Sequence, residues 1–189
     1  MPDLASVLEQ ARVPEHSAPF MQAMSQGTAF LEGEYLFLTA DDWLMAIGYP
    51  LSGEYAHDSF ERALAAALRR VPKRLEGVDC WAIGPDLPAR LAGHVTDRDT
   101  FYILPCDAPV PARLRRPVEI AAEKLTVREG RDFTPAHRRL WAEFMNRAVL
   151  PPNVRGLFAR TGAVLDTPGL RLLDAVDAEG NLAASLLLD

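Results

Sequence analysis

The 189-residue sequence has little cysteine and no long apolar run, and each absence excludes a class of protein. Its two cysteines, Cys80 and Cys106, are too few for a disulfide framework or a four-cysteine zinc site. No apolar run approaches the roughly 18 residues that a membrane-spanning helix needs. The first residues have no basic cluster and no unbroken apolar core, which argues against a secretory signal. We therefore expect a soluble, cytoplasmic protein in which both cysteines are buried as small apolar side chains.

Positive charge is also in short supply. The chain has 20 Lys and Arg against 26 Asp and Glu, a net charge of −6, and its isoelectric point is near 5.2. A domain that binds nucleic acid usually has a net basic face, so this balance argues against one. Hydrophobic residues make up 49% and charged residues 24% of the chain, as in ordinary globular domains. The length suits one large domain or two small ones.

Common catalytic and metal-binding motifs are missing. The sequence contains no Gly-x-Ser-x-Gly elbow and neither of the usual glycine-rich phosphate loops. Ser185 is therefore expected to be a strand residue rather than a nucleophile. The histidines stand too far apart for a local metal motif, so we expect no metal site and favour solvated or helix-capping roles for them. The four are His16, His57, His94 and His137.

The first half of the chain is expected to alternate strands and helices. The best-marked helix is predicted over residues 58–71, where apolar residues recur at helical spacing and Asp58 is the expected N-cap. Two β-rich runs around the turn at residues 40–42 predict a hairpin. The other expected elements are a broken helical arm over residues 2–26, a strand over 78–84, a short helix over 85–92 and a strand over 100–105.

A proline-rich stretch over residues 106–117 is interpreted as a connector. It contains a compact basic cluster, Arg113, Arg115 and Arg116, which are the candidate substrate-binding residues because guanidinium groups bind phosphate and carboxylate. The alternative is that these arginines form a solvated turn that balances the acids of an acidic protein.

The second half begins after this connector. Thr134 is the expected N-cap of a helix with Pro135 at its first position. Two apolar runs flank a polar turn that contains Gly180, which strongly predicts a β-hairpin. The expected elements are a strand over residues 125–128, helices over 134–148 and 154–162, and hairpin strands over 170–176 and 182–188.

In this order, the second half resembles the opening of an N-acyltransferase of the GNAT superfamily. The strand at 125–128, the two helices and the hairpin are similar to that fold's first strand, helix pair and second and third strands. The hairpin turn, residues 177–184, is similar to the acidic–glycine–apolar turn that is usual in the family.

The first half is similar to the upstream half of tandem GNAT-like proteins. These include the Fem-type aminoacyl transferases and the C-terminal domain of lysyl-phosphatidylglycerol synthetases. The similarity lies in the strands at 80–84 and 101–104 and in the connector with Arg115 and Arg116, which matches their basic linker.

The resemblance implies an α/β (α+β) fold, a GNAT-like mixed sheet flanked by helices. Expected domains are a helical arm over residues 1–29, a first GNAT-like half over 30–117 and the start of a second half over 118–189, apparently truncated. It also implies an acyl-CoA or aminoacyl-tRNA donor, a small-molecule or peptide amine as acceptor, and direct acyl transfer, with the splay between strands supplying a backbone oxyanion contact. The alternative is a non-catalytic GNAT-like module for packing or partner binding.

One departure from the family affects the mechanism. GNAT enzymes hold the donor's pyrophosphate at a helix N-terminus after a loop of the type Gln/Arg-x-x-Gly-x-Gly/Ala, and the sequence has no such loop. No general base is identifiable either, so no catalytic residue is assigned. If the fold is cut short after residues 182–188, that strand is an exposed sheet edge, and we expect self-association through it.

Overall fold

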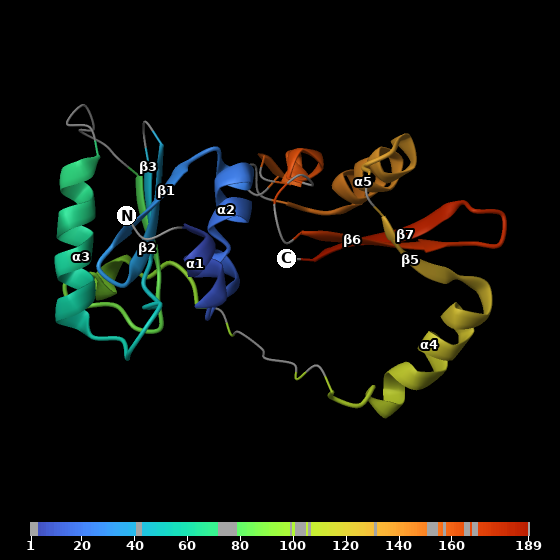
Figure 1. Ribbon diagram of the computed structural model, residues 1–189, viewed down its shortest axis with the longest axis horizontal. Helices are drawn as coiled ribbons and strands as arrows, with labels where there is room; N and C mark the ends of the chain where they lie inside the picture. Colours follow the sequence, from blue (N-terminus) through green and yellow to red (C-terminus); the bar gives the residue numbers. More distant parts are fainter. Residues whose placement is uncertain are drawn as a thin grey trace. The chain divides into compact units, whose positions relative to one another are not determined.

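The computed structural model describes residues 4–40, 43–71, 79–98, 100, 105, 107–130, 132–150, 155–156, 158–164, 167 and 170–188. The chain divides into two compact units (Figure 1). The first unit comprises residues 1–95, 159–168 and 189, and the second comprises residues 96–158 and 169–188. Each contains one β-sheet with helices, so the predicted mixed α/β class is confirmed.

The first unit is built on a four-stranded sheet in the order β1-β2-β3-β4. β1, β2 and β3 are antiparallel neighbours, whereas β4 runs parallel to β3 after the crossover helix α3. The predicted hairpin is confirmed as β2 and β3, while β1 was not predicted. The bounds are β1 Thr28–Glu32, β2 Tyr35–Ala40, β3 Trp43–Ile47, α3 His57–Arg70 and β4 Asp79–Ile83.

Helices cover both faces of this sheet (Figure 1). α3 packs on the face that contains Tyr35 and Phe37, and the N-terminal helices pack on the face that contains Leu36 and Leu38. Successive residues of β2 thus point into two separate apolar cores, as the period of a strand requires. The N-terminal arm is broken as predicted, into α1 Leu4–Glu9, the 3-10 helix η1 Pro14–His16 and α2 Ala18–Ser25.

Three details of the first half differ from expectation or cannot be compared with it. α3 begins at His57 with Ala56 as N-cap, so Asp58 lies in its first turn, where its charge complements the helix dipole, and does not cap it. The stretch 85–92 forms turns, followed by the short 3-10 helix η2 Ala92–His94, rather than the expected helix. The strand expected over 100–105 falls largely outside the described residues.

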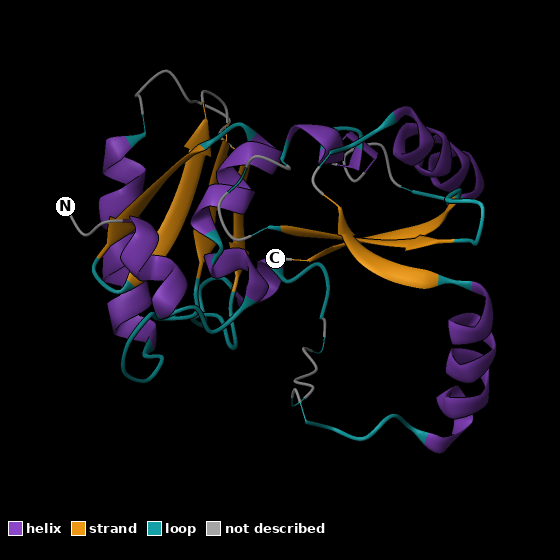
Figure 2. Ribbon diagram, turned by 45° about the vertical axis from the view of Figure 1, so that its right-hand side comes forward, coloured by secondary structure: helices purple, strands orange, loops and turns teal. Residues whose placement is uncertain are grey.

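The second unit has a three-stranded antiparallel sheet in the order β5-β6-β7 (Figure 2). The predicted hairpin is confirmed as β6 and β7, with Gly180 at φ 83° in its turn. The predicted helix begins at Pro135 as expected. The bounds are α4 Ala112–Lys124, β5 Thr126–Gly130, α5 Pro135–Arg147, β6 Arg171–Val176 and β7 Leu182–Leu188. Residues 155, 156 and 158 are also helical. The 3-10 helix η3 Thr161–Ala163 belongs to the first unit.

The two faces of this sheet differ. On one face the alternate β6 residues Leu172, Asp174 and Val176 are buried. On the other face Val127 is 66% and Leu186 is 55% exposed. Burial on one side alone gives β6 the alternating pattern of a half-buried strand.

The connector prediction is wrong for residues 112–117, which begin α4. The helix tolerates Pro117 in its interior because every residue of α4 is exposed, so the carbonyl that loses its partner there remains accessible to water. Figures 1 and 2 show α4 extending away from the sheet that it precedes in the chain.

Candidate functional site

A pocket of about 610 Å³ lies in the second unit. It is formed by the end of β5, the first turn of α5 and the turn between β6 and β7, and this volume suits a small ligand. Most of the residues that line it are charged or polar. They include Arg128, Glu129, Asp132, His137, Arg139 and Asp174.

A buried imidazole–carboxylate pair forms one wall of the pocket. His137 Nε2 lies 2.9 Å from Asp174 Oδ1, and both side chains are only 4% exposed. The backbone N–H of Thr134 donates to His137 Nδ1 at 3.1 Å. Nδ1 is therefore an acceptor, which places the ring proton on Nε2, where it is donated to Asp174.

The carboxylate of Asp174 also accepts a hydrogen bond from β7 and packs closely against β5. Ser185 Oγ donates to the same Oδ1 at 2.9 Å. Arg128, Asp174 and Ser185 stand opposite one another on β5, β6 and β7, so the three side chains form a row on one face of the sheet. A Cβ at Gly130 would lie 2.5 Å from Asp174 Oδ2, so only glycine leaves room for this carboxylate.

His137 also closes a capping box at the start of α5. Its ring accepts the N–H of Thr134, the Thr134 side chain pairs with the His137 backbone, and Thr134 Oγ1 lies 2.8 Å from Nδ1. Both ring nitrogens are thus engaged, one with the helix cap and one with β6. This arrangement fixes the helix against the strand and leaves no free nitrogen to accept a substrate proton. The pocket is therefore better suited to binding than to base catalysis by His137.

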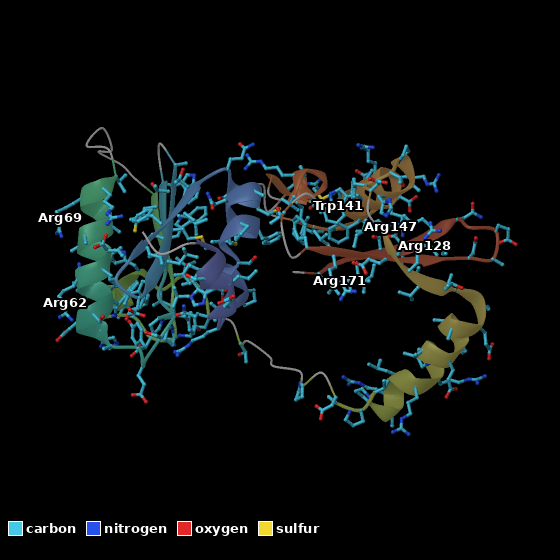
Figure 3. The ribbon with its side chains drawn as sticks, viewed as in Figure 1. Arg62, Arg69, Arg128, Trp141, Arg147 and Arg171 are labelled. Carbon is cyan, nitrogen blue, oxygen red and sulfur yellow. The ribbon has the colours of Figure 1, made fainter. Side chains whose placement is uncertain are left out.

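The remaining charges of the pocket differ in how they are neutralised. Glu129 receives two hydrogen bonds from Arg171, at 3.3 and 3.1 Å. Arg128, Arg139 and Asp132 form no ion pair with any residue that the structure describes. Figure 3 shows Arg128 on β5 and Arg171 on β6. Two guanidinium groups and one carboxylate of the pocket thus have no charged partner among the described residues.

The arginines singled out in the sequence lie elsewhere. Arg113, Arg115 and Arg116 are exposed residues of α4, and none of them lines the pocket. Arg115 Nε donates to Val110 O at 3.4 Å, and Arg116 lies 3.8 Å from Glu119. The structure therefore places all three on one solvated helix, and a substrate-binding role for them stays a prediction.

The other three histidines lie in the first unit and do not line the pocket. His16 is fully buried in the first unit, where Nδ1 accepts the Arg12 N–H at 3.1 Å and Nε2 donates to Tyr49 O at 2.9 Å. Burial lowers the pKa of His16. His57 forms an exposed pair with Asp86 at 3.1 Å. Among the described residues no group of three or more potential ligands could hold a metal.

The expectation for cysteine is wrong in one case. Cys80 is an exposed free thiol on β4 rather than a buried one, because β4 lies at the edge of its sheet. Cys106 falls outside the described residues. Nor does the described part of the chain include a helix that is both long and apolar enough to cross a bilayer.

The loop over residues 48–56 leads from β3 into α3. Arg12 Nη1 donates to Gly53 O at 2.6 Å, which ties the loop to the N-terminal arm. At the other end, Ala56 caps α3 without a side-chain hydrogen bond, so the first backbone N–H groups of the helix have no cap. β3 and β4 stay paired along their lengths, and the N–H of Gly48 donates to Ile83 O at 2.5 Å.

The sequence contained one signal for the buried pair that was missed. Asp174 interrupts an alternating apolar strand at an inward-facing position, between Leu172 and Val176. A charged residue on a buried face needs a partner. Its partner, His137, lies 37 residues away in the chain, and the local pattern around it shows only a helix start.

No protein-family model, curated protein or solved structure matches this chain.

Proposed function

We propose that this chain is part of a GNAT-like acyltransferase that transfers an acyl or aminoacyl group to an amine. The observation that supports it most is the element order of the second unit. β5 is followed by α5, by the helical residues 155, 156 and 158 and by the antiparallel hairpin β6–β7. This is the order on which the resemblance to the family's first strand, helix pair and next two strands depends.

Within this proposal, the start of α3 in the first unit is the candidate donor site. Members of the family bind the pyrophosphate of acyl-CoA at a helix N-terminus, and the uncapped start of α3 after loop 48–56 presents backbone N–H groups of that kind. The loop lacks the family's glycine pattern, and the N–H of Gly48 is already bonded to Ile83. We therefore expect donor binding to be weak.

A non-catalytic module is the second candidate, and a specific observation favours it. Direct transfer needs a group that removes a proton from the attacking amine. His137, the buried histidine of the pocket, has both ring nitrogens engaged.

The test combines donor binding with transfer. Calorimetric titration with acetyl-CoA should give a dissociation constant weaker than low micromolar, because about 8 kcal/mol of binding at that level needs a fitted phosphate loop. Release of free CoA thiol in the presence of a lysine peptide would support acyl transfer. Absence of both acetyl-CoA binding and thiol release would favour the non-catalytic module.

Two variants that add the same charge to α3, one at its start and one inside it, test whether the donor binds at the start of the helix. Ala56→Asp adds a capping carboxylate that competes with a phosphate for the same N–H groups and should abolish any acetyl-CoA binding. Ala65→Asp adds the same charge at an exposed position inside α3 and should leave binding nearly unchanged. Equal effects of the two variants would place the donor elsewhere.

A further inference from the structure

We propose that the pocket of the second unit binds an anionic group, a carboxylate or a phosphate, between Arg128 and Arg139. The role of this ligand rests on the proposed function, because the anionic group would belong to the amine acceptor and would hold it for transfer. Binding itself is a property of the pocket and can be tested without any transfer reaction.

The distribution of charge around the pocket carries the inference. Each guanidinium has several N–H donors, and neither Arg128 nor Arg139 uses them in an ion pair with a described residue. Glu129 follows Arg128 on β5, so its side chain lies on the other face of the sheet, where it is bonded to Arg171. The two arginines come from different elements, β5 and α5, yet line the same pocket of about 610 Å³. Two guanidinium groups at one pocket can together bind the charged oxygens of a carboxylate or phosphate.

The acids of the pocket do not reverse this preference. The carboxylate of Asp174 is buried and receives hydrogen bonds from His137 and Ser185, so it faces protein donors. Asp132 is the exposed acid, and it is outnumbered by the two arginines. Its negative charge opposes an anion, which makes its removal an informative variant.

The first turn of α5 adds a backbone contribution. Pro135 has no N–H, and the His137 N–H pairs with the side chain of Thr134. The N–H of Ala136, which lines the pocket, is the donor of this turn that remains for a ligand. Because the dipole of this 13-residue helix also favours negative charge at its start, it strengthens the site that the arginines define.

The wall behind the arginines is rigid. The pair His137–Asp174 joins the start of α5 to β6, and Ser185 extends the contact to β7. Arg139 follows His137 by two residues on the helix and Arg128 stands opposite Asp174 on the sheet. The elements that present the two guanidinium groups are therefore held together before a ligand arrives, which lowers the entropy cost of binding.

The experiment is a titration of the full chain, followed by amide NMR, with inorganic phosphate, with acetate and with choline as a cationic probe, all at constant ionic strength. We expect saturable shifts around Gly130, Ala136 and Asn181 with phosphate or acetate, with a millimolar dissociation constant, and none with choline. Saturation by phosphate alone identifies a phosphate site, and saturation by acetate alone identifies a carboxylate site. Saturation by choline, or shifts that rise linearly without saturation, would overturn the proposal.

Four variants test the roles of the residues. Arg128→Gln and Arg139→Gln should each weaken anion binding about tenfold, since each removes a charge-assisted contact. Asp132→Asn should strengthen it, whereas Arg138→Gln, an exposed neighbour outside the pocket lining, should change it by less than about twofold through general charge alone. Equal losses in Arg138→Gln and Arg139→Gln would reduce the effect to surface charge and refute the site.

Folding and function are separated by two further measurements. Arg139→Lys keeps the positive charge but loses the paired N–H donors of the guanidinium. This variant should bind the anion with intermediate affinity, even if Arg139→Gln fails to fold. Anion binding without any acyl transfer would support the anion site and contradict the proposed function. Acyl transfer without saturable anion binding would support the proposed function and contradict the anion site.

Discussion

The two units of this chain solve the burial of a β-sheet differently. In the first unit, helices cover both faces, and its core residues Phe37, Leu38 and Phe60 are 0% exposed. In the second unit, only alternate β6 residues on one face are buried, and Leu186 on the other face is 55% exposed. The buried face of the second unit contains an ionisable pair, His137 and Asp174, at its centre. The comparison indicates that the first unit depends on apolar packing, whereas the second depends on a specific polar contact.

The largest effect should come from the apolar core of the first unit. Phe37→Ala removes a ring with no exposed surface that stacks on Phe30 at 5.5 Å, and it should lower the free energy of unfolding of this unit by about 3–5 kcal/mol. Phe144→Ala is the counterpart in the second unit. Phe144 is 41% exposed and contacts Trp141 and Phe158 at the unit's surface, so its loss should cost only about 1 kcal/mol. Urea unfolding followed by fluorescence gives both values, and equal costs would contradict the comparison.

The polar contact of the second unit should give the next effect. His137→Ala leaves Asp174 buried without its main donor and removes half of the capping box, so we expect a loss of about 3 kcal/mol. His137→Gln retains an amide that can accept the Thr134 N–H and donate to Asp174, so it should cost about 1 kcal/mol. Urea unfolding monitored by the NMR signals of β6 measures both. A loss as large in the glutamine variant would show that the imidazole ring itself is required.

The pH dependence of stability should distinguish the units. Burial holds the pKa of His16 below its ordinary value of 6.5, so its neutral form is favoured in the folded first unit. Below that value the unfolded chain takes up a proton that the folded unit resists. The stability of the first unit should therefore be full above about pH 6.5 and should fall as the pH drops toward the folded pKa. Unfolding midpoints at several pH values check this, and the slope should flatten in His16→Gln but not in His94→Gln, an exposed control.

Local patterns in the sequence predicted much of the fold, and long-range contacts explain most of what was missed. The runs at 171–176 and 182–188 are apolar on both sides of a glycine-containing turn, so the hairpin β6–β7 followed from composition alone. β1 was missed because its five residues carry little pattern of their own and become a strand by pairing with β2. α4 was missed because Pro117 and the prolines before the helix outweighed its good helix formers.

The candidate site was even less accessible to sequence reasoning. The basic cluster at Arg113 was conspicuous because its members are adjacent, whereas Arg128 and Arg139 are 11 residues apart and meet only because β5 leads directly into α5. The pairing of His137 with Asp174 depends on the register of α5 against β6, for which no local pattern exists. Adjacent residues are easy to single out, but a pocket is formed by residues that the fold brings together.

The smallest effect concerns the open face and edge of the second unit. β7 is an edge strand, and Leu186 and Leu188 are 55% and 38% exposed beside its unpaired edge. An exposed apolar edge can pair with the same edge of a second copy, so we expect weak self-association, seen as a rise in apparent mass with concentration in light scattering. Leu186→Lys should reduce it with little change in stability. Leu187→Lys places a charge opposite Leu172, which is 5% exposed, and should mainly destabilise the unit. A chain that stays monomeric at high concentration would show that this edge does not pair in solution.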